Sequence, residues 1–296
     1  MIYPHEGNVL RDELENFSMC DPHHPCLPSE HIGDELDDTP DKNTTRLYFQ
    51  NLNGICWDKD GGLWPYICDA LEGIQVDVAC FAETNCDTSK YSIRTEMERI
   101  CELRFHPSRL IMATSKYQAP SSYKAGGTAI LACNSITSSI KGHTRDRMGR
   151  WSSICLHTNS NRQIRIISAY QVCEGQRVGS TSAASQQYAQ ILEETETIPD
   201  SQRVNPRQAF IRDLQAFIRQ LQSAGEDIIL VGDFNEEMDS PISGIASLAQ
   251  SCSLADLFNI RLGSSKIPAT YQRGQRRIDF VLLSPSLVPH VRSAGY

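Results

Sequence analysis

From residue 45 onward, short apolar runs alternate with amphipathic stretches along the chain. Apolar runs bounded by turn-forming residues predict strands over 47–51, 76–83, 109–113, 127–133, 152–158, 164–170, 228–235 and 277–283, and a weaker one over 269–272. Apolar positions at helical spacing predict helices over 62–73, 92–104, 182–197, 207–223 and 242–250. Strands mixed with helices throughout predict an α/β sheet protein with a single body over 45–296.

The first 44 residues have a different pattern. They contain five prolines, and 11 acidic residues against 2 basic ones, with few periodic apolar positions. Such a segment cannot bury enough apolar surface to fold, so 1–44 is expected to be a disordered acidic tail. It contains a loose group of metal-ligand types whose spacing matches no standard zinc site, and an unstructured tail is the favoured interpretation. These residues are Cys20, His23, His24, Cys26 and His31.

Charge and composition narrow the class of protein. The formal net charge is −8, but residues 45–296 hold 25 acidic and 26 basic residues, so the body is close to neutral. A neutral body argues against broad, charge-driven adhesion to nucleic acid. No stretch approaches a membrane span, and the N-terminus lacks the pattern of a secretory signal. The 11 cysteines are therefore expected to be reduced and mostly buried in an intracellular protein.

The strongest local signal is the sequence Gly-Asp-Phe-Asn at 232–235, which ends an apolar strand. Open α/β sheets bind ligands at the carboxyl ends of their strands, so Asp233 and Asn235 are candidates for a site. Asp233 could orient or deprotonate water, and Asn235 could bond a phosphoryl oxygen as charge develops. A simple Asp-Phe-Asn turn explains the tetrapeptide alone equally well.

Other predicted strands end on polar residues too. Glu83 follows a buried run and suits a hard cation such as Mg²⁺, which prefers one or two carboxylates together with water and substrate oxygens. Asn51 and Asn53 follow the first strand, and Tyr170 ends the run at 164–170. Asp279 lies in an otherwise apolar segment, where a carboxylate is costly unless it is paired.

The order of these strand ends resembles the endonuclease/exonuclease/phosphatase superfamily, and most of all its non-LTR retrotransposon and apurinic-site endonuclease domains. The order is Asn-x-Asn-Gly, Glu-Thr, Ala-Tyr, Gly-Asp-Phe-Asn and Arg-Ile-Asp, and it spans roughly residues 45–296. The resemblance implies a four-layer sandwich, as in deoxyribonuclease I: two mixed β-sheets flanked by helices, with the site where the sheets meet.

The resemblance also implies roles for individual residues. Asn51 and Glu83 match the metal-site residues, with Asn53 as an outer helper and Mg²⁺ or Mn²⁺ as the expected ion. Tyr170 matches a phosphate-contacting tyrosine, and Asp279 matches the aspartate of the Arg-Ile-Asp signature. Asp233 matches the aspartate that activates the attacking water or orients the phosphate. Asn235 matches the asparagine that stabilises the transition state. Asp256 and the Gly126-Gly127-Thr128 segment are expected to be structural.

One family motif, Ser-Asp-His near the end of the domain, does not occur in these 296 residues. His290 follows a proline, has no preceding aspartate and is a poor replacement. The domain is therefore expected to be incomplete at its C-terminus. Losing a positioned group of this kind costs roughly 10²–10⁴-fold in rate, so the chain could be nearly inactive.

Three functions stay open at this point. The first is DNA cleavage by a magnesium-dependent, retroelement-type endonuclease, for which a nuclear location is also conceivable. Arg150, Arg276 and Arg277 would then contact backbone phosphates, although solvated charged turns would also explain them. The second is a phosphatase or phosphodiesterase for small or lipid head-group phosphates. The third is a non-catalytic remnant of the fold.

Overall fold

The computed structural model describes residues 32–34, 41, 43–158, 160–173, 181–194, 205–239, 244–263, 267–270 and 276–296. The segment 1–44, expected to be a disordered tail, lies almost wholly outside these residues, and so do Cys20, His23, His24, Cys26 and His31. Its described residues 32–34 form an antiparallel bridge with the end of the chain, Gly33 opposite Gly295. Segments 1–36 and 293–296 make up one compact unit, and 37–292 make up another.

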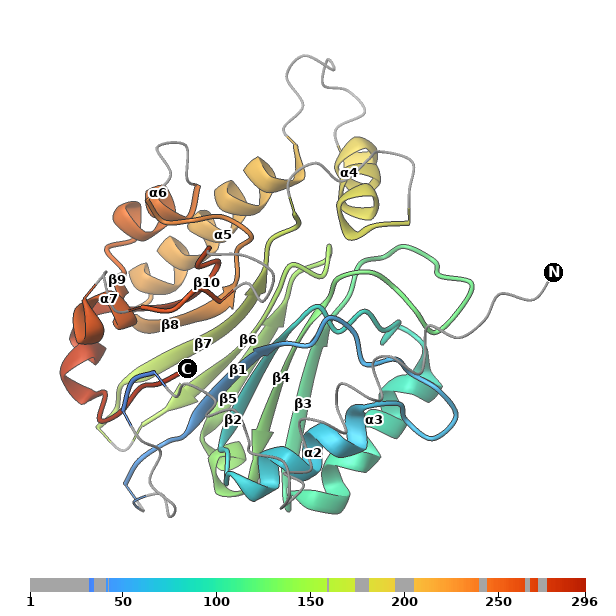
Figure 1. Ribbon diagram of the computed structural model, residues 1–296, viewed down its shortest axis with the longest axis horizontal. Coiled ribbons are helices and arrows are strands. Elements are labelled where there is room, and N and C mark those ends of the chain that lie inside the picture. The colour runs from blue at the N-terminus through green and yellow to red at the C-terminus, as the bar shows by residue number, and fades with distance from the viewer. Residues whose placement is uncertain are drawn as a thin grey trace, which may run out of the picture. The chain divides into compact units, whose positions relative to one another are not determined.

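Residues 37–292 form two mixed β-sheets (Figure 1). The first sheet has the order β1 (Leu47–Asn51), β2 (Val78–Ala82), β4 (Thr128–Cys133), β3 (Ser108–Ala113). The second has the order β5 (Ile140–Arg145), β6 (Trp151–His157), β7 (Gln163–Tyr170), β8 (Glu226–Asp233), β10 (Asp279–Leu283), β9 (Ala255–Asp256). The β1–β2 and β7–β8 pairs are parallel, and the other pairs are antiparallel.

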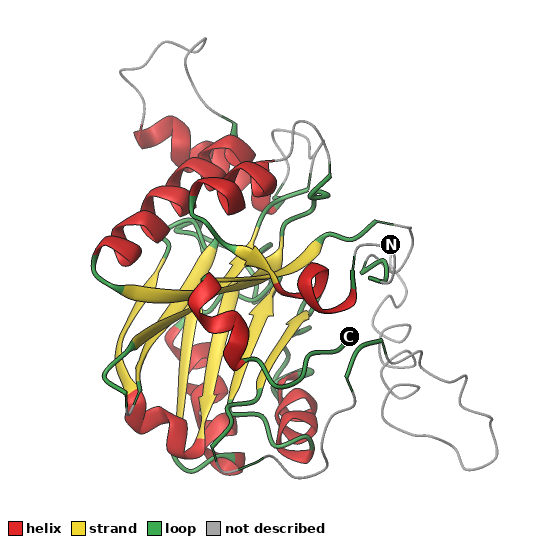
Figure 2. Ribbon diagram, turned by 90° about the vertical axis from the view of Figure 1, so that its left-hand side faces the viewer, coloured by secondary structure: helices red, strands yellow, loops and turns green. Residues whose placement is uncertain are grey.

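Helices flank the two sheets (Figure 2). They are α2 (Trp64–Gly73), α3 (Tyr91–Arg104), α4 (Ala183–Glu194), α5 (Pro206–Ser223), α6 (Gly244–Ser251) and α7 (Leu257–Leu262), with 3₁₀ turns at Asn134–Ser139 and Pro285–His290. Helix α5 begins where the Asn205 side chain accepts a hydrogen bond from the Gln208 N–H, at 2.9 Å. No helix in the described part of the chain is long and apolar enough to cross a membrane.

Alternation along the strands divides the core into layers. Val78 and Cys80 face the second sheet and pack with residues such as Ile154 and Val231, whereas their neighbours on β2 face α2 and α3. Successive strand residues point to opposite faces, so a strand buried on both sides must be apolar throughout, as the sequence of β2 is. This arrangement confirms the predicted four-layer sandwich.

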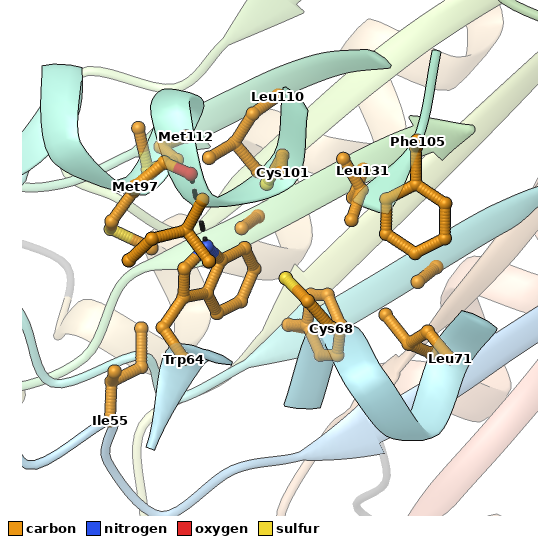
Figure 3. Close-up of a cluster of buried hydrophobic side chains, with 14 of the residues drawn as sticks. Ile55, Trp64, Cys68, Leu71, Met97, Cys101, Phe105, Leu110, Met112 and Leu131 are labelled. Atoms are coloured by element: carbon orange, nitrogen blue, oxygen red, sulfur yellow. Dashed lines mark hydrogen bonds between the residues drawn. The ribbon is translucent and has the colours of Figure 1, made fainter. Parts of the chain in front are cut away.

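Trp64 is at the centre of the outer core of the first sheet (Figure 3). Its indole N–H donates to the Met97 carbonyl at 3.2 Å, and its ring meets that of Phe81 edge-on, with centroids 5.6 Å apart. Cys68 and Cys101 fill space nearby as small apolar side chains. All nine cysteines among the described residues are free thiols and seven of them are buried, as expected.

Four elements differ from the sequence-based expectations. One is strand β9, which at two residues is too short to show an alternating pattern. Strand β5 is not predicted because only one of its six residues is buried and a glycine interrupts it, so an edge strand of this kind shows no periodicity. Helix α7 is too short to show a helical pattern. Of the weak strand expected over 269–272, residues 269 and 270 are not in a strand and the other two lie outside the described residues.

The aromatic contact between α5 and the second sheet gives a stability prediction. Phe210 is 1% exposed and packs edge-on to Trp151 and Phe234. Replacing Phe210 with alanine should lower the free energy of unfolding by about 3–5 kcal/mol in urea denaturation, because it removes buried apolar surface and leaves a cavity. Leu103→Ala, at a side chain 55% exposed, is the control and should stay within about 0.5 kcal/mol of the parent. Equal losses of unfolding free energy in the two variants would contradict the assignment of Phe210 to the buried layer between α5 and the second sheet.

Candidate active site

The topology brings five of the predicted site residues to one edge of the two sheets. Asn51 and Glu83 lie at the carboxyl ends of β1 and β2, which are parallel. Tyr170 and Asp233 are register partners at the carboxyl ends of β7 and β8. Strand β10 runs antiparallel to β8, so its first residue, Asp279, is the register partner of Asp233 at the same edge.

The side chain of Asn51 joins the two sheets at this edge. Its Nδ2 donates to Asp233 Oδ2 at 2.7 Å and to Glu83 Oε1 at 3.2 Å. Its Oδ1 accepts from the backbone N–H of Asn53 at 2.9 Å. In this arrangement the amide nitrogen of Asn51 faces the carboxylates. The side chain of Asn53 is exposed, and Asn53 contacts the Asn51 amide only through its backbone N–H.

The loop after β2 holds Glu83 in an uncommon backbone conformation. Glu83 has a φ of +49°, which non-glycine residues seldom adopt. Its carbonyl accepts from the Gly54 N–H at 2.8 Å, and Asn85 Oδ1 accepts from the Gly126 N–H at 2.7 Å. A Cβ on Gly127 would be 2.7 Å from Thr84 Oγ1, so the expected structural role of this glycine pair follows from close backbone approach.

A buried ion pair supports the same loop. Lys124 Nζ lies 2.7 Å from Asp87 Oδ1, and the two side chains are 1% and 2% exposed. Lys124 also donates to the Ser115 carbonyl at 3.0 Å. These contacts connect the chain beyond Glu83 to the β3–β4 connection, so they fix the position of the glutamate from outside the site.

The carboxyl groups at the edge disfavour each other's charge. Burial, followed by the charges of Asp279 and Glu83, raises the pKa of Asp233 to about 8, against hydrogen bonds from Asn235 and Asn51 that lower it. Burial and then the charge of Glu83 raise the pKa of Asp279 to about 6, although the Thr270 hydroxyl and Arg277 lower it. Asp279 Oδ1 is buried and has no hydrogen-bond partner among the described residues.

These residues fit a divalent cation by their chemistry. Buried carboxylate oxygens that repel each other, one of them without a partner, are the hard ligands that Mg²⁺ takes up beside water and substrate oxygens. The described residues contain no group of three His, Cys, Asp or Glu side chains arranged as a complete set of metal ligands. A cation here would therefore complete its shell with water or substrate, as Mg²⁺ commonly does.

Tyr170 and Asn235 can supply hydrogen-bond donors to a phosphate. Tyr170 is 3% exposed, and burial, together with the charges of Glu83, Cys173 and Asp233, raises its pKa well above the usual value. Its hydroxyl therefore keeps its proton at neutral pH. Asn235 Nδ2 donates to the Gln171 carbonyl at 2.8 Å, and the Asn235 backbone N–H donates to Asp233 Oδ1 at 2.9 Å.

The glycine of the Gly-Asp-Phe-Asn sequence has a packing reason. A side chain on Gly232 would collide with the Ala169 carbonyl on the neighbouring strand β7. Phe234 is fully buried between α5 and β10, where its ring lies 6.2 Å from that of Phe210 and 6.1 Å from that of Phe280. The motif thus fixes the strand end that carries Asp233.

Two of the three predicted phosphate-binding arginines form ion pairs with carboxylates of this chain. The expectation for Arg150 is wrong, because its side chain is 4% exposed, bonds Asp146 and Asp213 at 2.8–2.9 Å and stacks over Trp151. Arg277 makes a bidentate pair with Asp256 at 2.7 and 2.8 Å, so we assign it a structural role that it shares with Asp256. Arg276 is exposed, and its charge acts on Cys173 at the edge of the site.

Four residues that sequence reasoning missed also support the site. Thr270 Oγ1 accepts from the N–H groups of Ile278 and Asp279, both at 3.0 Å, and holds the start of β10. Arg207, in the first turn of α5, donates to the Val172 and Asn235 carbonyls. The other two, Gln171 and Cys173, follow Tyr170 and bond the Asn235 amide. Only their proximity to Tyr170 could have drawn attention to them.

His290, the poor replacement for the histidine of Ser-Asp-His, does not lie at the edge that carries the site. His290 ends the 3₁₀ turn that follows β10, and Leu283, at that end of β10, pairs with Ile229 near the start of β8. His290 therefore follows the end of β10 opposite to Asp279. His143 lies on β5, where burial and the charges of Arg109 and Arg145 lower its pKa.

A protein-family model matches residues 51–296, under the description Endonuclease/Exonuclease/phosphatase family. The chain belongs to this family, whose members are hydrolases of phosphoesters and generally use divalent metal ions. No curated protein matches the chain.

Solved structures resemble the chain at low sequence identity. An endonuclease/exonuclease/phosphatase family protein from Leptotrichia buccalis is 12% identical, with a TM-score of 0.50, covering 81% of this chain and 88% of that one. An AP endonuclease from Archaeoglobus fulgidus is 16% identical, with a TM-score of 0.49, covering 83% and 89%. The 3′ phosphatase NExo from Neisseria, bound to a product DNA hairpin, is 15% identical, with a TM-score of 0.49 and the same coverage.

The raised pKa of Asp279 predicts how stability depends on pH. The pKa of Asp279 rises from 3.8 to about 6 on folding, so the charged carboxylate destabilises the folded state. This loss of folding free energy grows as the pH rises from about 4 to 6 and reaches its full size above pH 6. In EDTA, Asp279→Asn should match the parent at pH 4 and exceed it at pH 8, by up to about 3 kcal/mol in urea denaturation. A variant less stable than the parent at pH 8 would contradict the clustering of carboxylates.

The buried pair behind Glu83 gives a second stability prediction. Lys124→Met leaves Asp87 buried without its cation and should cost about 3–5 kcal/mol at pH 7, measured by urea denaturation. The double variant Lys124→Met, Asp87→Leu should recover most of this loss, because no uncompensated charge stays buried. Lys90→Met is a matched control, since Lys90 lies 3.9 Å from Asp87 at the surface and should contribute less than about 1 kcal/mol.

Proposed function

We propose that this protein hydrolyses phosphodiester bonds in DNA as a divalent-metal-dependent endonuclease of the retroelement type, with Mg²⁺ or Mn²⁺ as the ion. The observation that carries the proposal is the single edge shared by three carboxylates and two donors, Glu83, Asp233, Asp279, Tyr170 and Asn235. The choice of DNA rests on the motif order along the sequence. From the choice of a DNA substrate we also infer an intracellular location, including the nucleus.

Each residue has a proposed part in the reaction. Glu83 would hold the cation, with Asn51 bonded to its carboxylate and Asn53 holding the Asn51 amide through its backbone N–H. The cation, when bound, would polarise the phosphoryl oxygen and stabilise the departing one. Asp233 would accept the proton of the attacking water, and its raised pKa suits a base working near neutral pH. Tyr170 and Asn235 would donate to the phosphoryl oxygens as charge accumulates. Asp279, the register partner of Asp233, would raise the pKa of Asp233 through its charge and so adjust the strength of that base.

A second candidate is a phosphatase or phosphodiesterase for small or lipid head-group phosphates. The inward pairing of Arg150 and Arg277 favours it, because it removes two cations that a long polyanion would need. The near-neutral charge of residues 45–296 points the same way. Arg276 is the exposed cation that the DNA proposal retains.

A nicking assay on supercoiled plasmid tests the main proposal. The parent should nick DNA with Mg²⁺ and not in excess EDTA, and Asp233→Ala should lower the rate roughly 10²–10⁴-fold. Glu83→Gln should need more Mg²⁺ for half-maximal rate, because one negative ligand is lost. Glu237→Gln, at an exposed carboxylate four residues from Asp233, is the control and should behave as the parent.

The outcomes of the assay separate the three functions. Nicking that survives Asp233→Ala would contradict the proposed site. No nicking, together with Asp233-dependent phosphate release from small phosphoesters, would favour the second candidate. Loss of both activities in a folded parent would identify a non-catalytic member of the fold.

A further inference from the structure

The amide of Asn235 is held at both ends by the segment that follows Tyr170. Its Nδ2 donates to the Gln171 carbonyl at 2.8 Å, and its Oδ1 lies 3.1 Å from Cys173 Sγ, whose S–H donates to it. The backbone at Asn235 is fixed as well, with a φ of +49° and an N–H that donates to Asp233 Oδ1. The side chain therefore has a defined orientation in the absence of substrate.

The two contacts distinguish the two ends of the amide. The Gln171 carbonyl can only accept, so a reversed amide would place two oxygens against each other there. The reversal would also replace the S–H bond from Cys173 to Oδ1 with an N–H contact to sulfur, which is a weak acceptor. Nδ2 carries two hydrogens and donates one of them to the Gln171 carbonyl. Cys173, by holding Oδ1, supports the orientation that the Gln171 carbonyl selects, and the second hydrogen of Nδ2 is then available to a phosphoryl oxygen.

The surroundings keep the thiol in its donor form. Burial, and then the charges of Glu83 and Asp233, raise the pKa of Cys173, against Arg207 and Arg276, which lower it. A protonated thiol donates a hydrogen bond, whereas a thiolate would repel the amide oxygen. Arg207 closes the arrangement by donating to the Val172 carbonyl at 2.6 Å and to the Asn235 carbonyl at 3.4 Å, so it holds the two loops together.

We propose that Cys173 is a positioning residue for the hydrolytic reaction, which orients the Asn235 amide so that its Nδ2 faces the phosphoryl oxygen of the substrate. The inference rests on the proposed function, since it assigns Asn235 its part in that reaction. Cys173 acts through Asn235 and does not itself touch substrate.

Kinetics with matched variants test the inference. Cys173→Ser keeps a donor at this position and should retain kcat within about threefold, whereas Cys173→Ala removes the donor and should lower kcat about tenfold with little change in KM. In an Asn235→Ala background the Cys173→Ala change should have no further effect. Cys56→Ala, at the exposed cysteine, should leave kcat unchanged. Equal kcat for the alanine variant and the parent would overturn the inference.

Infrared spectroscopy of the S–H stretch gives a test that needs no activity. The Cys173 band, isolated as the parent-minus-Cys173→Ser difference, should lie at the lower frequency of a hydrogen-bonded thiol and move to the free-thiol position in Asn235→Ala. A free-thiol band in the parent would overturn the inference even if the enzyme is active. A parent with the shifted band but no hydrolysis would instead reject the proposed function. Urea denaturation of each variant excludes loss of folding as the cause.

Discussion

The carboxyl groups of Glu83, Asp233 and Asp279 are brought to one edge by two different sheets, and the rest of the site depends on keeping them there. In water the solvent would screen these charges from one another. Here burial and mutual repulsion raise the pKa of Asp233 to about 8 and that of Asp279 to about 6. Asn51 connects the sheets by donating to both Glu83 and Asp233. Like-charged groups held this close are costly in stability, and such a cost is typical of a site prepared for a cation or a proton transfer.

The scaffold around these groups explains how that cost is tolerated. The inter-sheet core lies directly behind the edge, and β7, β8 and β10 fix the register of Tyr170, Asp233 and Asp279. The Lys124–Asp87 pair secures the loop that carries Glu83 from outside. A rigid frame of this kind places donors and carboxylates before substrate arrives, which is how electrostatic stabilisation lowers a barrier.

Much of the fold could be predicted because its strands are continuous apolar runs that end abruptly on polar residues, as β8 does at Asp233. Those ends also identified most of the residues that the structure brings together, although their roles in catalysis stay predictions. Ion pairs between residues far apart in the chain could not be predicted from the pattern of apolar and polar positions. Arg150 bonds Asp213 and so could not be recognised as internal. Cys173 was missed because its hydrogen-bond partner, Asn235, is distant in the sequence and follows the end of the next strand.

Titration calorimetry of Mg²⁺ binding, repeated in two buffers of different ionisation enthalpy, tests the central claim most directly. If Glu83 holds a cation beside Asp233, the parent should bind one Mg²⁺ at pH 7 and release protons, because the charge of the cation lowers the pKa of Asp233, which is about 8 without it. The release should fade by pH 9, and Glu83→Gln should bind much more weakly. Binding without proton release at pH 7, or binding unchanged in Glu83→Gln, would contradict the account.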